Sequence, residues 1–154
     1  MTTIVEFNPS NLANFTFQPT LDGQTYGAVT TYNSYSNRYY LGIYTQQNVL
    51  QLNIPLIASP NVVVQGATTT EASSFIKLIT RNGAIYAGMN VNGVGVTTGT
   101  KVIGVYGALI ELNQNAVLTK SNTTLSFTYS INLMKGYFNT PIVFRASANN
   151  FEIG

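Results

Sequence analysis

The acidic side chains are the first residues to consider for chemistry, and the chain has only five of them: Glu6, Asp22, Glu71, Glu111 and Glu152. Hydrolysis of a glycosidic bond requires two carboxylates on either side of the sugar. The five acids are widely spaced in the sequence, and Asp22 before Gly23 is already explained as a turn residue. Glu111 fits the polar position between two apolar residues of a strand. We therefore do not expect an acid-pair active site.

The most common catalytic base and the thiol nucleophile are missing. The chain has no histidine and no cysteine, which excludes an imidazole base, a Ser-His-Asp triad, a thiolate nucleophile and thiolate metal sites. A lysine that serves as a base in a Ser-Lys arrangement would need burial to lower its pKa, and we expect all four lysines at the surface: Lys77, Lys101, Lys120 and Lys135. The sequence therefore predicts no catalytic residues, and we expect a protein that is not an enzyme.

The sequence also has no complete motif for a loop that binds a cofactor or a metal ion. Gly93-Val94-Gly95 followed by Gly99 lacks the spacing of GxGxxG, and the next residues, KVIGVY, form a strand pattern where a phosphate-binding helix would be required. Asp22 lacks the further acids that a calcium-binding loop supplies. We expect no cofactor and no metal ion.

Tyrosine is the side chain that remains for binding. In the stretch from Arg38 to Tyr44, alternate residues divide between two faces. One face carries Tyr39, Leu41 and Ile43, which suit a core, and the other carries Arg38, Tyr40, Gly42 and Tyr44. Large amphipathic rings on an outer face indicate contact with a partner. The candidate interface residues are Tyr35, Arg38, Tyr40 and Tyr44.

Composition indicates what these rings contact. Charged residues make up 8% of the chain and hydrophobic residues 45%, so uncharged polar side chains must cover much of the surface, and such surfaces associate readily. The net charge of +2 comes from isolated residues, which argues against nucleic-acid binding. Rings also stack on sugars. Recognition of a polysaccharide through Tyr35, Tyr40 and Tyr44 is therefore the alternative hypothesis.

The elements that must position these residues are short strands. Glycine, proline, asparagine and threonine recur between short apolar runs, and no long window has a helical period. We predict an all-β protein, a small β barrel or sandwich with an inserted small β module. The expected strands are Ile4 to Phe7, Phe15 to Gln18, Thr25 to Tyr32, Arg38 to Tyr44, Leu50 to Ile54, Asn61 to Val64, Phe75 to Thr80, Lys101 to Tyr106, Leu109 to Leu112, Leu125 to Tyr129 and Ile142 to Arg145.

A shift in composition divides the chain. The stretch from Pro60 to Phe127 holds only four of the 10 tyrosines and 8 phenylalanines, but eight of the 13 glycines. Within it, glycines punctuate short apolar runs between Gly88 and Leu112, which is typical of strands joined by glycine turns. We predict one β domain formed by residues 1–59 and 128–154, interrupted by a glycine-rich β module at 60–127. The polar run from Thr119 to Thr124 is expected to lie near the exit from the module.

No targeting or membrane segment is expected. The N-terminal residues MTTIVEFNPSN lack a basic start and a long apolar run, and no later segment has the length needed to span a bilayer. We therefore expect a chain made in the cytoplasm.

Both ends of the chain carry a family resemblance. The features are Leu21-Asp22-Gly23 with Tyr26, the strand Tyr39 to Tyr44, Pro55-Leu56-Ile57, and a tail with Gly136-Tyr137 and Phe144-Arg145. In this order and spacing they resemble the small plug proteins in the baseplates of contractile-tailed bacteriophages. The match covers about the first sixty and the last twenty-seven residues. Gly88 to Ala116 resembles a glycine-rich β module that recurs in phage virion proteins.

The resemblance implies a structural role in a virion, in a tail baseplate assembled in the host cytoplasm. It implies a plug-like β domain near the tail axis, present in multiple copies in a symmetric assembly, that joins hub, tube and sheath-initiator proteins until contraction. The inserted module would contact a further neighbour such as sheath or wedge. No catalytic residue carries over from the family, and neither nucleic acid nor membrane is an expected partner. In a virion setting, the alternative hypothesis becomes a receptor-binding or tail-fibre module that recognises host polysaccharide through Tyr35, Tyr40 and Tyr44.

Overall fold

The computed structural model describes residues 1–154, and nearly all of its regular structure is β. Fifteen strands and a single 3₁₀ turn, η1 (Ala146–Ala148), follow one another along the chain. Every strand pair is antiparallel and no sheet closes into a barrel, so the all-β prediction is confirmed and the architecture is sandwich-like. No helix has the length and apolar character that crossing a membrane requires.

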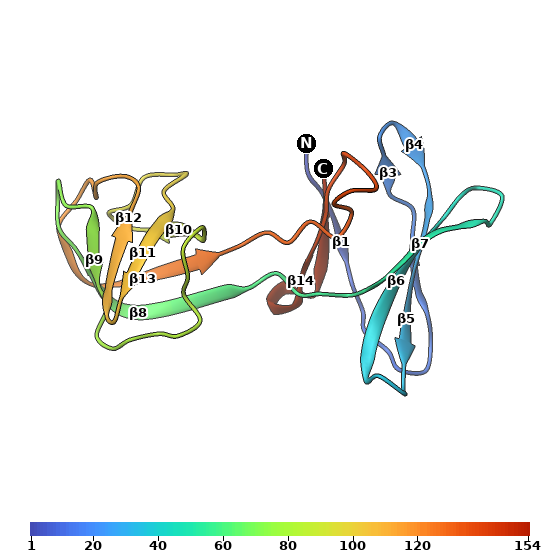
Figure 1. The fold of residues 1–154 in the computed structure, drawn as a ribbon, viewed down its shortest axis with the longest axis horizontal. Helices are drawn as coiled ribbons and strands as arrows, with labels where there is room; N and C mark the ends of the chain where they lie inside the picture. Colours follow the sequence, from blue (N-terminus) through green and yellow to red (C-terminus); the bar gives the residue numbers. More distant parts are fainter. The chain divides into compact units, whose positions relative to one another are not determined.

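The chain forms two compact units, and the ribbon passes from one to the other twice (Figure 1). Unit 1 consists of Met1–Ser59 and Ser130–Gly154, and unit 2 consists of Pro60–Tyr129. The predicted division placed the first boundary at the same position and the second boundary two residues earlier, after residue 127.

Unit 1 contains two sheets and one small hairpin. The four-stranded sheet has the order β2-β5-β6-β7, and the three-stranded sheet has the order β1-β15-β14. The four-stranded sheet comprises β2 (Phe15–Phe17), β5 (Gly27–Asn33), β6 (Arg38–Tyr44) and β7 (Leu50–Pro55). The three-stranded sheet comprises β1 (Thr3–Glu6), β14 (Ile142–Arg145) and β15 (Asn150–Ile153), while β3 (Thr20–Leu21) pairs with β4 (Gln24–Thr25).

The core of unit 1 is built by one face of each sheet. Alternation along β6 places Leu41 and Ile43 inside, and alternation along β15 does the same for Phe151. Phe7 lies at the centre of an aromatic cluster, with edge contacts to Phe15, Tyr39, Phe144 and Phe151 at ring-centroid distances of 5.2 to 5.6 Å. Because these rings come from both ends of the chain, the core forms only when residues 1–59 and 130–154 fold together.

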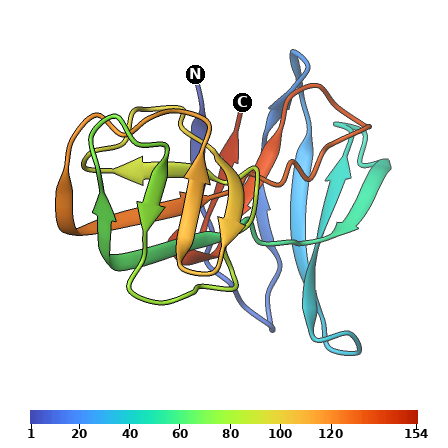
Figure 2. The ribbon, with the colours of Figure 1, turned by 60° about the vertical axis from the view of Figure 1, so that its left-hand side comes forward.

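Unit 2 is a six-stranded antiparallel sheet with its own core, and Figure 2 gives a second view of its ribbon. The order is β10-β13-β8-β9-β12-β11. The strands are β8 (Asn61–Thr69), β9 (Phe75–Lys77), β10 (Asn90–Gly93), β11 (Val102–Tyr106), β12 (Leu109–Leu112) and β13 (Lys120–Thr128). The two ends of the sheet approach each other at a bridge between Asn90 and Lys101, where the N–H of Val102 also donates to the carbonyl of Met89 at 2.9 Å. Ile76, Ile110 and Phe127 are completely buried in this core.

The predicted glycine turns of unit 2 are confirmed. Gly93, Gly95, Gly99 and Gly107 all have positive φ angles, between 68° and 146°, which side-chain-bearing residues rarely adopt. Gly93 is also a position of close approach, since a Cβ there would lie 2.7 Å from the backbone oxygen of Thr124.

Three expectations about the strands need correction. β3, β10 and β15 were not predicted, and β13 begins at Lys120, before the predicted start at Leu125, so most of the polar run Thr119 to Thr124 is strand. Pairing with β8, which includes Thr123 opposite Ala67, gives this polar segment its extended conformation. β9 also ends at Lys77, earlier than predicted, because its partner β12 begins at Leu109, opposite Lys77, directly after the turn at Gly107 and Ala108.

Candidate interaction surface

Three of the four candidate interface residues lie on one face of β6. Arg38, Tyr40 and Tyr44 alternate with the inward-facing residues of the strand, and we call this side of the four-stranded sheet the tyrosine face. Arg38 is exposed, whereas Tyr40 and Tyr44 are half-buried. Each tyrosine has cross-strand neighbours on both sides: Tyr40 pairs with Thr31 and Pro55, and Tyr44 pairs with Gly27 and Leu50.

The ring of Tyr44 packs over Gly42, two positions earlier on the same strand. A Cβ at Gly42 would lie 2.9 Å from Cε2 of Tyr44 and 3.3 Å from its hydroxyl oxygen, so the ring covers the glycine. Gly42 is buried as a result. The absence of a side chain at this position lets the ring lie back along β6 toward Tyr40, which presents an aromatic surface close to the sheet.

Tyr35 does not join the other three on the strand. It is fully exposed in the turn between β5 and β6, with a relative accessibility of 101%. The side-chain oxygen of Asn33 accepts hydrogen bonds from the backbone N–H groups of Tyr35 and Ser36, at 2.9 and 3.2 Å, and fixes the start of the turn. The Tyr32 hydroxyl donates to Asn37 Oδ1 at 3.1 Å across the same turn. The turn is therefore ordered while its tyrosine projects into solvent.

Sequence reasoning missed the residues that complete the tyrosine face. The register places Val29 beside Gly42, Thr31 and Pro55 beside Tyr40, and the exposed Leu50 beside Tyr44. Apart from Arg38, these paired positions are uncharged. The alternation in each strand indicated which residues face outward, but the order β2-β5-β6-β7 was needed to show which of them are neighbours.

Asp22, the one aspartate of the chain, has structural partners. Asp22 lies in the two-residue turn between β3 and β4, where it and Gly23 both have positive φ angles, as a type I′ hairpin requires. Its carboxylate accepts hydrogen bonds from the backbone N–H groups of Asn139 and Thr140 at 3.0 and 2.8 Å. These backbone hydrogen bonds lower the pKa of Asp22 below its ordinary value. Asp22 therefore joins a hairpin to a distant segment.

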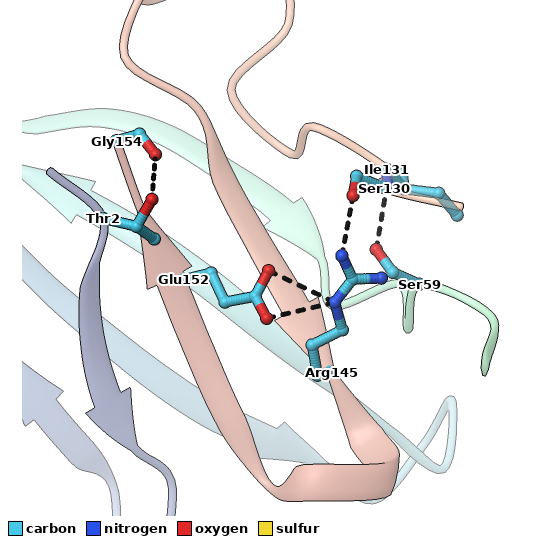
Figure 3. A network of polar contacts seen from close by, with 7 residues as sticks. All are labelled: Thr2, Ser59, Ser130, Ile131, Arg145, Glu152 and Gly154. Atoms are coloured by element: carbon cyan, nitrogen blue, oxygen red, sulfur yellow. Dashed lines mark hydrogen bonds and ion pairs between the residues drawn. The ribbon is translucent and has the colours of Figure 1, made fainter. Parts of the chain in front are cut away.

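Glu152 is also engaged in a structural contact, shown in Figure 3. Its carboxylate accepts hydrogen bonds from Nε of Arg145, at 3.2 and 3.3 Å, across the β14–β15 pair. Nη2 of Arg145 donates to the hydroxyl of Ser130 at 2.7 Å, and the hydroxyl of the buried Ser59 accepts from the backbone N–H of Ile131 at 2.9 Å. This network holds both chain segments at the point where each meets the inserted unit.

The remaining charged side chains are exposed or bonded to a neighbour. All four lysines are exposed. Glu111 accepts a hydrogen bond from the hydroxyl of Tyr106 at 3.1 Å, which raises the pKa of that phenol. No group of three or more acidic residues lies close enough together to hold a metal ion.

Unit 2 carries a second glycine covered by a tyrosine. The ring of Tyr106 lies over Gly104 in β11, where a Cβ would come within 2.8 Å of the ring. Tyr106 is 61% exposed, and its cross-strand neighbour Leu109 is 39% exposed. Both units therefore present a tyrosine ring flattened against an outer strand surface.

Comparison with family models, with curated protein sequences and with solved structures gave no match.

Proposed function

We propose that this protein is a non-enzymatic structural component of a contractile phage tail, located in the baseplate near the hub. In this role it joins hub, tube and sheath proteins until contraction. The resemblance of the two chain ends to baseplate plug proteins supports the proposal, and the tyrosine face is the single structural observation on which it rests.

The tyrosine face has the chemistry of a protein interface. Tyrosine and arginine are enriched in such interfaces, and the residues that contribute most to affinity are often of these two types. Tyr40 and Tyr44 are already partly ordered by their neighbours in the sheet, so contact with a partner costs them little conformational entropy. Arg38 supplies one charge at the end of an otherwise uncharged face.

We assign a second protein–protein contact to unit 2. The outer face of β11 and β12 presents Tyr106 and Leu109, and a neighbour such as sheath or wedge is the proposed partner. A protein that contacts two neighbours through separate units acts as a joint between them. Multiple copies would occupy equivalent positions in a symmetric baseplate.

A binding experiment with purified hub and tube proteins tests the role of the tyrosine face. The double variant Tyr40→Ala/Tyr44→Ala is expected to weaken binding by at least about 30-fold, since central interface tyrosines typically contribute about 2 kcal/mol or more. Tyr137→Ala is the matched control, because Tyr137 is 64% exposed in unit 1 but lies outside the four-stranded sheet. Equal binding by wild type and the double variant would contradict the proposed interface.

A labelling experiment tests the location. Negative-stain images of virions carrying a tag on this protein are expected to show the label at the baseplate. Label on the capsid or on fibre tips would reject the assignment. A glycan array with the purified protein addresses the competing hypothesis, since sugar binding that is abolished by Tyr40→Ala would assign the tyrosine face to host recognition.

A further inference from the structure

A groove of about 430 Å³ lies in unit 1, apart from the tyrosine face. One wall is the β3–β4 hairpin with the residue that follows it, and the other is the start of the loop between β6 and β7, whose flanking strands are labelled in Figure 1. The lining residues are Gly23, Gln24, Thr25, Tyr26, Thr45, Gln46 and Gln47. The volume falls in the range of roughly 300 to 1,000 Å³ that is usual for small-ligand sites.

The lining is polar but carries no charge. Three carboxamides, two threonine hydroxyls and one phenol contribute groups that both donate and accept hydrogen bonds. Asp22 precedes Gly23 in the chain, but its carboxylate is bonded to Asn139 and Thr140. An anionic or cationic ligand would therefore find no compensating charge in the lining.

The hairpin wall of the groove is fixed by contacts to the rest of unit 1. The backbone N–H of Tyr26 donates to the carbonyl of Pro19 at 3.0 Å, and the Tyr26 ring meets Phe138 edge-on at 5.1 Å. The Tyr26 hydroxyl also donates to Gln24 Oε1 at 3.4 Å. These contacts, together with the bonds of Asp22, hold the wall before any ligand arrives.

The loop wall is fixed by Thr45. Its hydroxyl accepts from the backbone N–H of Val49 at 3.2 Å, its own N–H donates to the Val49 carbonyl at 2.9 Å, and its carbonyl accepts from the N–H of Asn48 at 2.9 Å. The exposed Gln46 and Gln47 project from a closed turn. A site with two ordered walls loses less conformational entropy on binding than a mobile loop would.

We propose that this groove binds a neutral saccharide, one or two hexose units of an uncharged glycan. Sugar hydroxyls need many donors and acceptors within a small area, and uncharged carboxamides and hydroxyls provide them. A peptide would require a free strand edge or apolar pockets for alternate side chains, whereas β3 and β4 each contain two residues and Tyr26 supplies the only ring. Tyr44 lies outside the lining, with its ring folded over Gly42.

Ligand titration with the full chain tests the proposal. The probes are maltotriose, cellotriose, chitotriose and a galactose trisaccharide, with trigalacturonic acid as the charged comparison, observed by saturation-transfer NMR and calorimetry. At least one neutral trisaccharide is expected to bind with millimolar or tighter affinity. The double variant Gln46→Ala/Gln47→Ala is expected to weaken that binding by about tenfold or more, because it removes two carboxamides.

Gln51→Ala is the matched control, since Gln51 is exposed on β7 and lies outside the groove lining. It should leave the affinity unchanged. The proposal is overturned if no neutral trisaccharide binds, if the Gln46/Gln47 double variant binds as wild type does, or if a neutral peptide binds in the groove and the sugars do not. Hub binding by the same double variant is expected to be normal, so failure of this proposal is distinguishable from failure of the tail role.

Discussion

Asp22 and Thr140 are bonded to each other in both directions, although 118 positions separate them in the sequence. Oδ1 of Asp22 accepts from the backbone N–H and the hydroxyl of Thr140, at 2.8 and 3.0 Å, and the hydroxyl oxygen of Thr140 accepts from the backbone N–H of Asp22 at 2.9 Å. The whole of unit 2 lies between these residues in the chain. The contact therefore joins the two segments of unit 1 after the inserted unit has been made.

Lowering the pH should weaken the contact between Asp22 and Thr140. The pKa of Asp22 is lowered in the folded protein by the backbone hydrogen bonds from Asn139 and Thr140, so the ionised form contributes stability above the ordinary pKa of 3.8. That contribution is lost as the pH falls below 3.8 and through the lowered pKa. Denaturant unfolding followed from about pH 6 to pH 2 should show a smaller acid-induced loss for Asp22→Asn than for wild type. Glu6→Gln, which changes an exposed acid of the same unit, is the control; identical pH profiles for Asp22→Asn and wild type would refute the role.

The hydroxyl of Thr30 should be dispensable. Thr30 is 1% exposed on the core side of β5, and its Oγ1 has no hydrogen-bond partner. Thr30→Val replaces this hydroxyl with a methyl group of similar shape, so the free energy of unfolding should stay the same or rise by about 1 kcal/mol. Thr69→Val is the informative comparison, because the Thr69 hydroxyl donates to Leu118 at 2.8 Å and its loss should cost about 1 kcal/mol. A marked loss of stability in Thr30→Val would contradict the prediction.

Two glycines should respond differently to the same substitution. At Gly42 the added Cβ meets the far end of the Tyr44 ring, which can rotate away, so Gly42→Ala should change stability by less than about 0.5 kcal/mol. At Gly93 the φ angle is 146° and the Cβ meets backbone, so Gly93→Ala should destabilise unit 2 by about 1 to 3 kcal/mol. Thermal unfolding of both variants measures the contrast. Hub binding by Gly42→Ala should fall if the flattened ring of Tyr44 forms part of the interface.

Unit 2 should be removable. Pro60 and Tyr129 are joined by a hydrogen bond of 3.2 Å at the points where the chain enters and leaves, and each unit has its own buried core. A chain in which a short Gly-Ser turn replaces residues 60–129 should fold, and residues 60–129 alone should also fold. Dispersed NMR spectra and cooperative unfolding of both pieces are the expected results. An unfolded unit 1 in the shortened chain would show that it depends on the insert.

The local pattern of this fold was readable from the sequence, and the long-range pairing was not. Alternation from Arg38 to Tyr44 predicted the strand and both of its faces, and the glycines of unit 2 predicted its turns. β15 was missed because only Phe151 and Ile153 are apolar in Asn150–Ile153 and the preceding asparagines are typical of a turn; the extended form of this segment depends on pairing with β1 and β14.

For the tyrosine face, the sequence predicted which side chains point outward but not which residues surround them. Tyr40 and Tyr44 lie on the outer face as their positions indicated, whereas their partial burial depends on neighbours in β5 and β7 and on the bare surface of Gly42. The groove at Gln46 and Gln47 left no pattern in the sequence, since it depends on two turns that are separated along the chain and approach each other only in the folded unit.

The paired crossings at Ser59–Pro60 and Tyr129–Ser130 have a mechanical consequence. A force applied to unit 2 is divided between two strands, β8 and β13, which are bonded to each other from Asn61 and Thr128 onward. On the other side the same force reaches Ser59 and Ser130, which are held by Ile131 and Arg145. Under tension the load between the two units is therefore shared by two covalent crossings of the chain, each anchored by hydrogen bonds on both sides.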